Sequence, residues 1–254
     1  MRAISAIGSI TIKEGIRDKV FLNLLLFGLL MLGLSLLIGD LSMGQEEKFV
    51  KDLGLAAISI IGNLTAILLS VGSLHREFDR RTLYSVLYRP IPRWGFLIGK
   101  YVGVCATTLL NVMAMSLIFL ILISIRGYPI GIGMLKAVYM ICLEVGLIAA
   151  IGMLLLQVLP FAPSVIFTAA LYVAGQMIDV LREMVASERG ISRGIIWAVY
   201  HLLPNFGALN VRSQAAYGLP IDPIYLVRAT AYVLLYIALL MTLSSFRFER
   251  GDLG

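Results

Sequence analysis

Charged side chains are scarce in this chain. They make up 14% of its 254 residues, whereas hydrophobic residues make up 59% and the mean hydropathy is +0.93. A soluble domain typically has about 25% charged residues. The composition therefore excludes an ordinary soluble enzyme or binding domain. It predicts an all-α, polytopic membrane protein, a single transmembrane domain over residues 1–254, whose apolar runs cross the bilayer as helices.

Cysteine and histidine are also scarce, with two residues of each. Cys105 and Cys142 fall in apolar runs, which indicates small buried side chains rather than a disulfide or a metal pair. His75 and His201 have no neighbouring Cys or His, so we expect no metal site. Nucleophile-elbow and zincin motifs are missing, and we therefore expect no catalytic residues.

Six apolar runs predict six membrane spans. They cover residues 20–39, 53–74, 102–125, 137–159, 161–178 and 229–246. Pro160 and Pro163 predict a tight hairpin between the fourth and fifth spans. Small residues at four-residue spacing, Gly99 with Gly103 and Gly146 with Ala150, favour close helix packing. No small-residue cleavage site follows the first run, so we expect it to remain in the mature protein.

Residues 1–19 carry a polar stripe at helical spacing. The stripe consists of Arg2, Ser5, Ser9, Lys13 and Arg17. This spacing predicts a helix lying in the membrane interface, and the alternative is a plain basic tail beside the first span. Six spans place both termini on one side, and most loop Lys and Arg residues flank the termini or lie in residues 75–101. The positive-inside rule then places the termini and this block in the cytoplasm.

The net charge of +6 fits basic loops facing an anionic inner leaflet, and it requires no nucleic acid partner. Residues 179–225 are long enough to be translocated regardless of charge, so we place them outside. Within them, residues 194–209 predict a short helix in the outer interface that ends at Pro204. Trp197, Tyr200 and Phe206 are candidates for an outer gate, and a structural cap is the alternative.

Residues 75–101 form the longest charged block between apolar runs. Asp79 is placed to cap a helix beginning near Arg80, Leu83 and Leu87 lie on its apolar face, and Pro90 ends it. The block predicts a cytoplasmic loop containing a short amphipathic helix, and the alternative is an ordinary basic loop. We interpret Lys100 as an anchor that reaches the membrane surface. Residues 95–101 resemble a phosphate loop but are one residue short and lack its Ser or Thr, so we expect no bound nucleotide.

Glu144 is the clear carboxylate inside a predicted span. A charge at mid-bilayer costs about 2.5–3.5 kcal/mol, so the side chain should face the bundle interior or a cavity. One hypothesis makes Glu144 part of a substrate or proton path. The other makes it a protonated or hydrogen-bonded carboxyl that joins helices through Asn63, Asn111, Gln157 or Gln176. Glu144, Asn63, Asn111 and Gln176 are therefore our candidates for an intramembrane path.

The charged block also contains the pattern Glu77-x-x-x-x-Thr82-Leu83-x-x-x-Leu87-x-x-Pro90, followed by Gly99-Lys100. It resembles the coupling-helix region of ABC-2 type (type-2 exporter class) ABC transporter permeases, and the resemblance extends over nearly the whole chain. The run Leu203-Pro204-Asn205-Phe206 resembles the outer segment of NosY-like permeases. The resemblance implies a non-catalytic subunit of the prokaryotic-type cytoplasmic (inner) membrane.

The same resemblance implies partners and site residues. A separate ABC ATPase would bind ATP and magnesium, this chain would bind no cofactor, and a second permease copy or a paralogue would complete an export path. The residues implied to dock on the ATPase are Glu77, Phe78, Asp79, Arg80, Arg81, Thr82, Leu83 and Leu87. Two other hypotheses remain: a secondary transporter or channel that uses Glu144, and an intramembrane enzyme, for which no nucleophile and base are visible.

Overall fold

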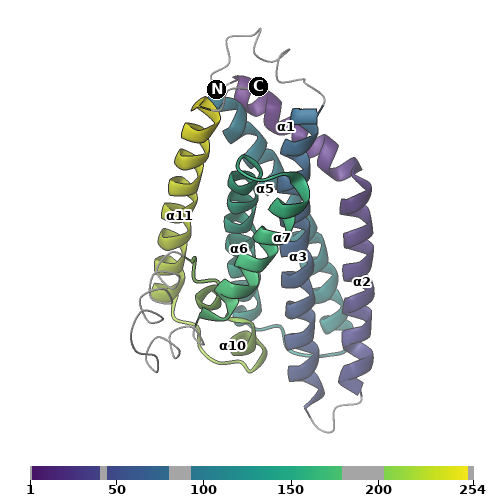
Figure 1. Ribbon diagram of the computed structural model, residues 1–254. Coiled ribbons are helices and arrows are strands. Elements are labelled where there is room, and N and C mark those ends of the chain that lie inside the picture. Colours follow the sequence, from purple (N-terminus) through teal and green to yellow (C-terminus); the bar gives the residue numbers. More distant parts are fainter. Residues whose placement is uncertain (1, 41–44, 80–92, 179–202, 251–254) are drawn as a thin grey trace.

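The computed structural model describes residues 2–40, 45–79, 93–178 and 203–250, and these residues form helices and no strand. The all-α prediction is therefore confirmed for this part of the chain. Long helices run up and down one bundle, and both termini lie at the same end (Figure 1). We call this the terminal end, and the opposite end, where α10 lies, the distal end.

The element bounds, in chain order, are α1 Arg2–Arg17, α2 Lys19–Asp40, α3 Glu46–Asp79, α5 Arg93–Ile125, α6 Ile132–Leu156, α7 Phe161–Gln176, η1 Gly207–Leu209, α10 Arg212–Ala216 and α11 Pro223–Arg250. Among the described residues, α2, α3, α5, α6 and α11 are long and apolar enough to cross a membrane. Helix α7 has 16 residues, which extend about 24 Å at 1.5 Å per residue. That is shorter than a hydrocarbon core of about 30 Å, so the six-span arrangement stays a prediction.

The long helices continue beyond the apolar runs from which they were predicted. Helix α3 begins at Glu46 and extends through the charged residues to Asp79, and α5 begins at Arg93. Both ends of the expected loop 75–101 are therefore helical, because charge alone does not end a helix. Residues 80–92, where the amphipathic helix was predicted, lie outside the described residues.

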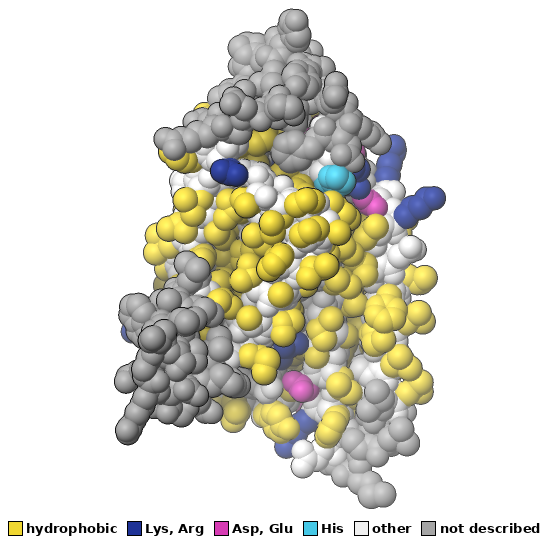
Figure 2. All heavy atoms as spheres, in the orientation of Figure 1, with side chains coloured by type: hydrophobic (Ala, Val, Ile, Leu, Met, Phe, Trp, Pro, Cys, Tyr) yellow, Lys and Arg dark blue, Asp and Glu magenta, His cyan; other side chains and the backbone are white. Residues whose placement is uncertain are grey.

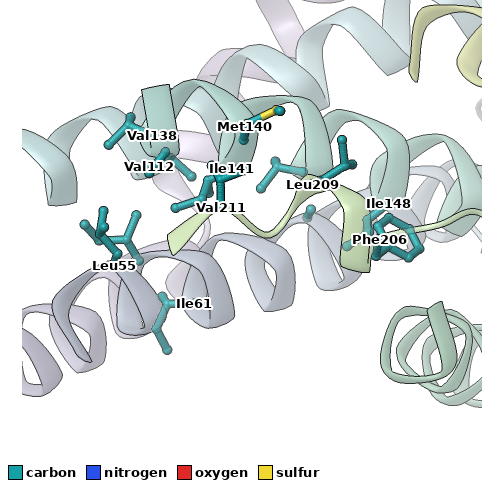
Figure 3. Packing of buried hydrophobic residues seen from close by; sticks show 14 of the residues in the cluster. Leu55, Ile61, Val112, Val138, Met140, Ile141, Ile148, Phe206, Leu209 and Val211 are labelled. Atoms are coloured by element: carbon teal, nitrogen blue, oxygen red, sulfur yellow. The ribbon is translucent and has the colours of Figure 1, made fainter. Parts of the chain in front are cut away.

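The core of the bundle lies around α3 and α6, which are the most buried of the spans. Figure 3 shows side chains from α3, α5 and α6 meeting those of residues 206–211 in one buried cluster. Gly62 on α3 makes room for this packing. A Cβ atom there would lie 2.8 Å from Cγ2 of Val112, closer than real contacts allow.

A band of hydrophobic side chains covers the middle of the face seen in Figure 2, with charged side chains above and below it. Leu26 on α2, Leu117 on α5 and Leu235 on α11 are each at least 60% exposed. Apolar surface of this extent is unfavourable in water and favourable against lipid tails. The surface thus supports the prediction of a membrane protein.

Helix α1 packs on α5 through small side chains. A Cβ atom at Gly103 would lie 2.5 Å from Cβ of Thr11 and 2.9 Å from the Gly8 carbonyl oxygen. One at Gly15 would lie 2.7 Å from Cγ2 of Thr107. The close approach predicted at Gly103 is confirmed, and we call this contact the α1–α5 seam.

The polar stripe of α1 is confirmed in part, and the second small-residue pair, Gly146 with Ala150, is not a close contact. Ser9, Lys13 and Arg17 are exposed as the polar stripe predicts, but Ile10 is also 56% exposed, because the buried face of α1 is the seam. At Gly146 a Cβ atom would meet nothing closer than 3.7 Å, so the second small-residue pair makes no comparably close contact. The interfacial position of α1 stays a prediction.

Candidate functional site

Lys100 lies in an ion-pair network at the terminal end. Its Nζ atom is 2.7 Å from Oε1 of Glu77 on α3 and 3.7 Å from Oε2 of Glu14 on α1. The Lys100 side chain is only 3% exposed. The expectation that Lys100 reaches out to the membrane surface is therefore wrong, because two carboxylates within the bundle attract its ammonium group inward.

A second ion pair ties the same end of the bundle to the start of α2. The Nη1 atom of Arg76 donates to Oδ2 of Asp18 at 2.6 Å, and the other oxygen of Asp18 accepts from the backbone N–H of Val20 at 3.0 Å. Asp18 thus caps the first turn of α2 while it binds α3. Together the three ion pairs, each of which includes a residue of the charged block, join α1, α3, α5 and the start of α2.

The residues proposed to dock on an ATPase are only partly within the described structure. Glu77 is in the last turn of α3, and its partner is Lys100. Phe78 and Asp79 end the same helix, so Asp79 belongs to α3. The others, Arg80, Arg81, Thr82, Leu83 and Leu87, lie outside the described residues.

The carboxylate of Glu144 lies near the middle of α6 and is buried, with 2% of the residue exposed. The hydroxyl of Ser59 on α3 donates to Oε2 at 3.2 Å, and Nε2 of Gln176 on α7 donates to Oε1. The expectation that Glu144 faces the bundle interior is confirmed. Its two hydrogen bonds join three helices, as the second hypothesis for this residue describes.

Hydrogen bonds extend from Glu144 in both directions. Nδ2 of Asn63 donates to Oγ of Ser59 at 3.3 Å. On the other side, Nδ2 of Asn210 donates to Oε1 of Gln176 at 3.4 Å, and Nε of Arg212 donates to Oδ1 of Asn210 at 2.8 Å. We call this series the polar chain, and its members are Asn63, Ser59, Glu144, Gln176, Asn210 and Arg212. It connects the buried middle of α3 and α6 with the exposed residue Asn210 and the start of α10.

The two remaining amide candidates do not reach Glu144. Asn111 is completely buried, and neither of its amide atoms has a hydrogen-bond partner in the described part of the chain. Nε2 of Gln157 donates to Oγ of Ser244 on α11 instead. Sequence reasoning missed Ser59 and Asn210. Ser59 could have been found from its position, because it lies four residues before Asn63 on the same helix face.

Phe206 is buried, although its segment was expected in the outer interface. Its ring is fully covered and packs edge-on against Tyr172, with centroids 5.6 Å apart. Gly175 on α7 leaves the space, since a Cβ there would lie 2.5 Å from Cδ2 of Phe206. The helix predicted in the outer interface was to end at Pro204, before Phe206, so its interfacial position stays a prediction, and Trp197 and Tyr200 lie outside the described residues.

Helix α7 and residues 203–211 lie one after the other along the length of α6. Gln176, at the end of α7, bonds to Glu144 halfway along α6, and Ala215 further along the chain lies 3.5 Å from an ideal Cβ at Gly133, near the start of α6. This part of the chain is thus helical in α7 and largely irregular in residues 203–211. Irregular backbone is tolerated at such depth when protein surrounds it, and Leu209 and Val211 are each only 2% exposed.

No group of three or more His, Cys, Asp and Glu residues able to hold a metal ion occurs within residues 2–40, 45–79, 93–178 and 203–250. Cys105 and Cys142 are free thiols. Ion pairs and hydrogen bonds join the helices at both candidate sites.

The family comparison agrees with the helical architecture. The model of the ABC-2 family transporter protein matches residues 6–253, and it does not distinguish a NosY-like subtype. A comparison with curated proteins gives no match. Proteins of the matching family are membrane permeases of ABC transporters and generally work with ABC ATPase subunits. This multi-pass membrane chain belongs to the ABC-2 transporter family.

Proposed function

We propose that this chain is the transmembrane subunit of an ABC exporter, and that separate ATPase subunits dock on residues 75–101. The terminal end, with both chain termini, faces the cytoplasm of a prokaryotic-type inner membrane. ATP and magnesium bind to the ATPase subunits, and this chain performs no catalysis. A second copy, or a paralogue, completes the transport path.

The observation that carries this proposal is the ion-pair network around Lys100. Residues 80–92 connect α3 to α5, and Lys100 binds those two helices together immediately next to that connection. Glu14 adds α1 to the same group, and the Arg76 and Asp18 pair adds the start of α2. A displacement imposed by an ATPase on residues 80–92 would therefore move four helices together rather than bend a single helix.

The direct test is affinity purification of the chain from its native membrane in mild detergent, followed by an ATPase assay. We expect a stoichiometric ATP-binding partner. Arg81→Glu, inside the charged block, should release this partner. Lys13→Glu is the matched control, because Lys13 is exposed on α1 and the substitution changes the charge equally outside the block. A preparation without ATPase activity, or a partner retained equally by both variants, contradicts the proposal.

The polar chain favours one second candidate, a gradient-driven transporter or channel that uses Glu144. A buried carboxylate linked by hydrogen bonds to an exposed residue is an arrangement typical of ion and proton paths. This candidate predicts flux without ATP, abolished by Glu144→Gln. The permease proposal predicts flux that requires the ATPase and survives the same substitution.

A further inference from the structure

A pocket of about 480 Å³ lies at the distal end of the bundle. Its walls come from the start of α3, from the turn before α6 with the first turn of that helix, and from residues 215–221. This volume falls within the range of small-molecule sites, about 300–1,000 Å³. We call it the distal pocket.

The residues that line the distal pocket carry more positive than negative charge. Lys48, Lys51 and Lys136 line it, and Glu47 is the one carboxylate among the lining residues. Three positive charges minus one negative charge leave a net charge of +2. A concave surface with this balance attracts an anion.

Oxygen acceptors hold the ammonium groups of Lys51 and Lys136 in place, and the single carboxylate of the pocket pairs with Lys51. Nζ of Lys51 is 2.5 Å from Oε1 of Glu47 and donates to the Pro129 carbonyl oxygen at 2.8 Å. Nζ of Lys136 donates to the Ile221 carbonyl oxygen at 2.6 Å. Since an ammonium group has three donors and a carbonyl carries no formal charge, Lys136 keeps its full charge beside the pocket.

Lys48 is positioned by an aromatic ring instead of a carboxylate. Its Nζ atom lies 5.3 Å from the centroid of Tyr217, which also lines the pocket. A contact with the face of a ring orients an ammonium group and leaves its charge in place. Lys48 can thus contribute to anion binding from the exposed rim of the pocket.

The start of α6 adds a fourth positive element. The N-cap residue, Gly131, makes no side-chain hydrogen bond, and the first turn of α6 contains no acidic residue. Gly131, Ile132 and Gly133 line the pocket. The amide groups and the dipole of a helix N-terminus favour a bound anion, and the first turn of α6 supplies no carboxylate of its own.

We propose that the distal pocket binds a phosphate ester, with Lys48, Lys51, Lys136 and the N-terminus of α6 around the phosphate oxygens. Lysine ammonium groups and backbone amides are a common combination for phosphate. The pocket lies beyond the apolar band of the bundle, where a lipid headgroup would reach it, and it is also large enough for a soluble phosphate ester. The proposal concerns binding alone and does not rest on the ATPase partner.

The test uses the full chain, purified in detergent and freed of lipid, with binding measured in the absence of ATP. The probes are dioctanoyl phosphatidylglycerol, for an anionic headgroup, and glycerol 1-phosphate, for a soluble ester. Dioctanoyl phosphatidylcholine is the zwitterionic control. We expect saturable binding of at least one of the two anionic probes, and the one that binds more tightly identifies the source of the phosphate group.

Two variants locate the binding in the pocket. Lys136→Gln and Lys48→Gln should each weaken binding by about tenfold or more, as expected for loss of one charged contact. The Lys48→Gln variant should fold normally, because Lys48 is exposed and its contact with the Tyr217 ring is small. A loss of binding in this variant therefore reflects the pocket and not misfolding. Lys19→Gln, an exposed lysine at the terminal end, should leave binding unchanged. No saturable binding of either probe, equal binding of phosphatidylcholine, or unchanged binding in both pocket variants overturns the proposal.

Discussion

The Nζ atom of Lys100 lies 2.7 Å from Oε1 of Glu77, and the lysine side chain is almost entirely buried. The Glu77 side chain, by contrast, is 20% exposed. An ion pair in this position holds α3 and α5 together next to the segment that joins them.

Glu77→Gln should destabilise the protein and uncouple it from the ATPase. Among the carboxylates that the structure describes, the substitution leaves Lys100 with Glu14, which is 3.7 Å away. Breaking a fully buried ion pair costs about 3–5 kcal/mol, and we expect a smaller loss because Glu14 remains. Thermal unfolding in detergent measures the stability, and ATPase activity of the purified complex measures the coupling.

Glu14→Gln is the control, with little expected change, since that side chain is 50% exposed. Equal effects of the two substitutions would contradict this view of Glu77.

Gly103→Ala should lower the melting temperature. The added methyl group would collide with Thr11 and with the backbone of Gly8, and overpacking of this kind costs about 1–3 kcal/mol. Gly33→Ala on α2 is a matched helical control, because a Cβ there meets nothing within 4 Å. The control should be neutral or slightly stabilising, by up to about 1 kcal/mol, since alanine favours helix. A stable Gly103→Ala protein would show that α1 does not dock as described.

Glu144→Ala should destabilise the bundle more than Glu144→Gln. Alanine leaves the Ser59 hydroxyl and the Gln176 amide without their acceptor, whereas glutamine keeps one acceptor oxygen and places its amide against the other donor. A buried donor left unpaired costs about 1–3 kcal/mol. Thermal unfolding of both variants gives the order. If both variants were as stable as the original protein, the polar chain would not be holding α3, α6 and α7 together.

Asn111→Leu should raise the melting temperature. The amide is buried without a hydrogen-bond partner in the described residues, and an unpaired buried polar group costs about 1–3 kcal/mol. Leucine has a similar volume and no polar atom. A more stable protein that has lost transport would identify Asn111 as a residue of the path. A less stable protein would mean that the amide has a partner, such as a buried water molecule, and would contradict the prediction.

Much of the architecture could be predicted because membrane helices follow from composition. Five apolar runs became helices long enough to cross a bilayer, and the interior position of Glu144 followed from the cost of a charge in lipid. The sixth run, residues 161–178, is mostly apolar, yet its helix ends at Gln176. Hydropathy does not record where such a helix ends, because the residues that follow it can also be apolar.

The contacts at the candidate sites were harder to predict because they join distant parts of the chain. Lys100 was assigned to the surface, since a sequence window does not show that Glu14 and Glu77 lie nearby. Phe206 was predicted as a candidate for an outer gate, and its burial depends on the space that Gly175 leaves on α7. Ser59 is one of many small polar residues in apolar helices, and its contact with Glu144 depends on the packing of α3 against α6.

The α1–α5 seam has a consequence for how the chain is made. Thr11 leaves the ribosome about ninety residues before its partner Gly103, with two membrane spans between them. At about 5–20 residues per second, the N-terminal helix waits roughly 5–20 s before the surface it fits exists. During that interval the surface that the small-residue face of α1 fits is missing, although α2 and α3, which α1 also contacts, are already made. A defect in the seam would therefore act during biogenesis as well as in the finished protein.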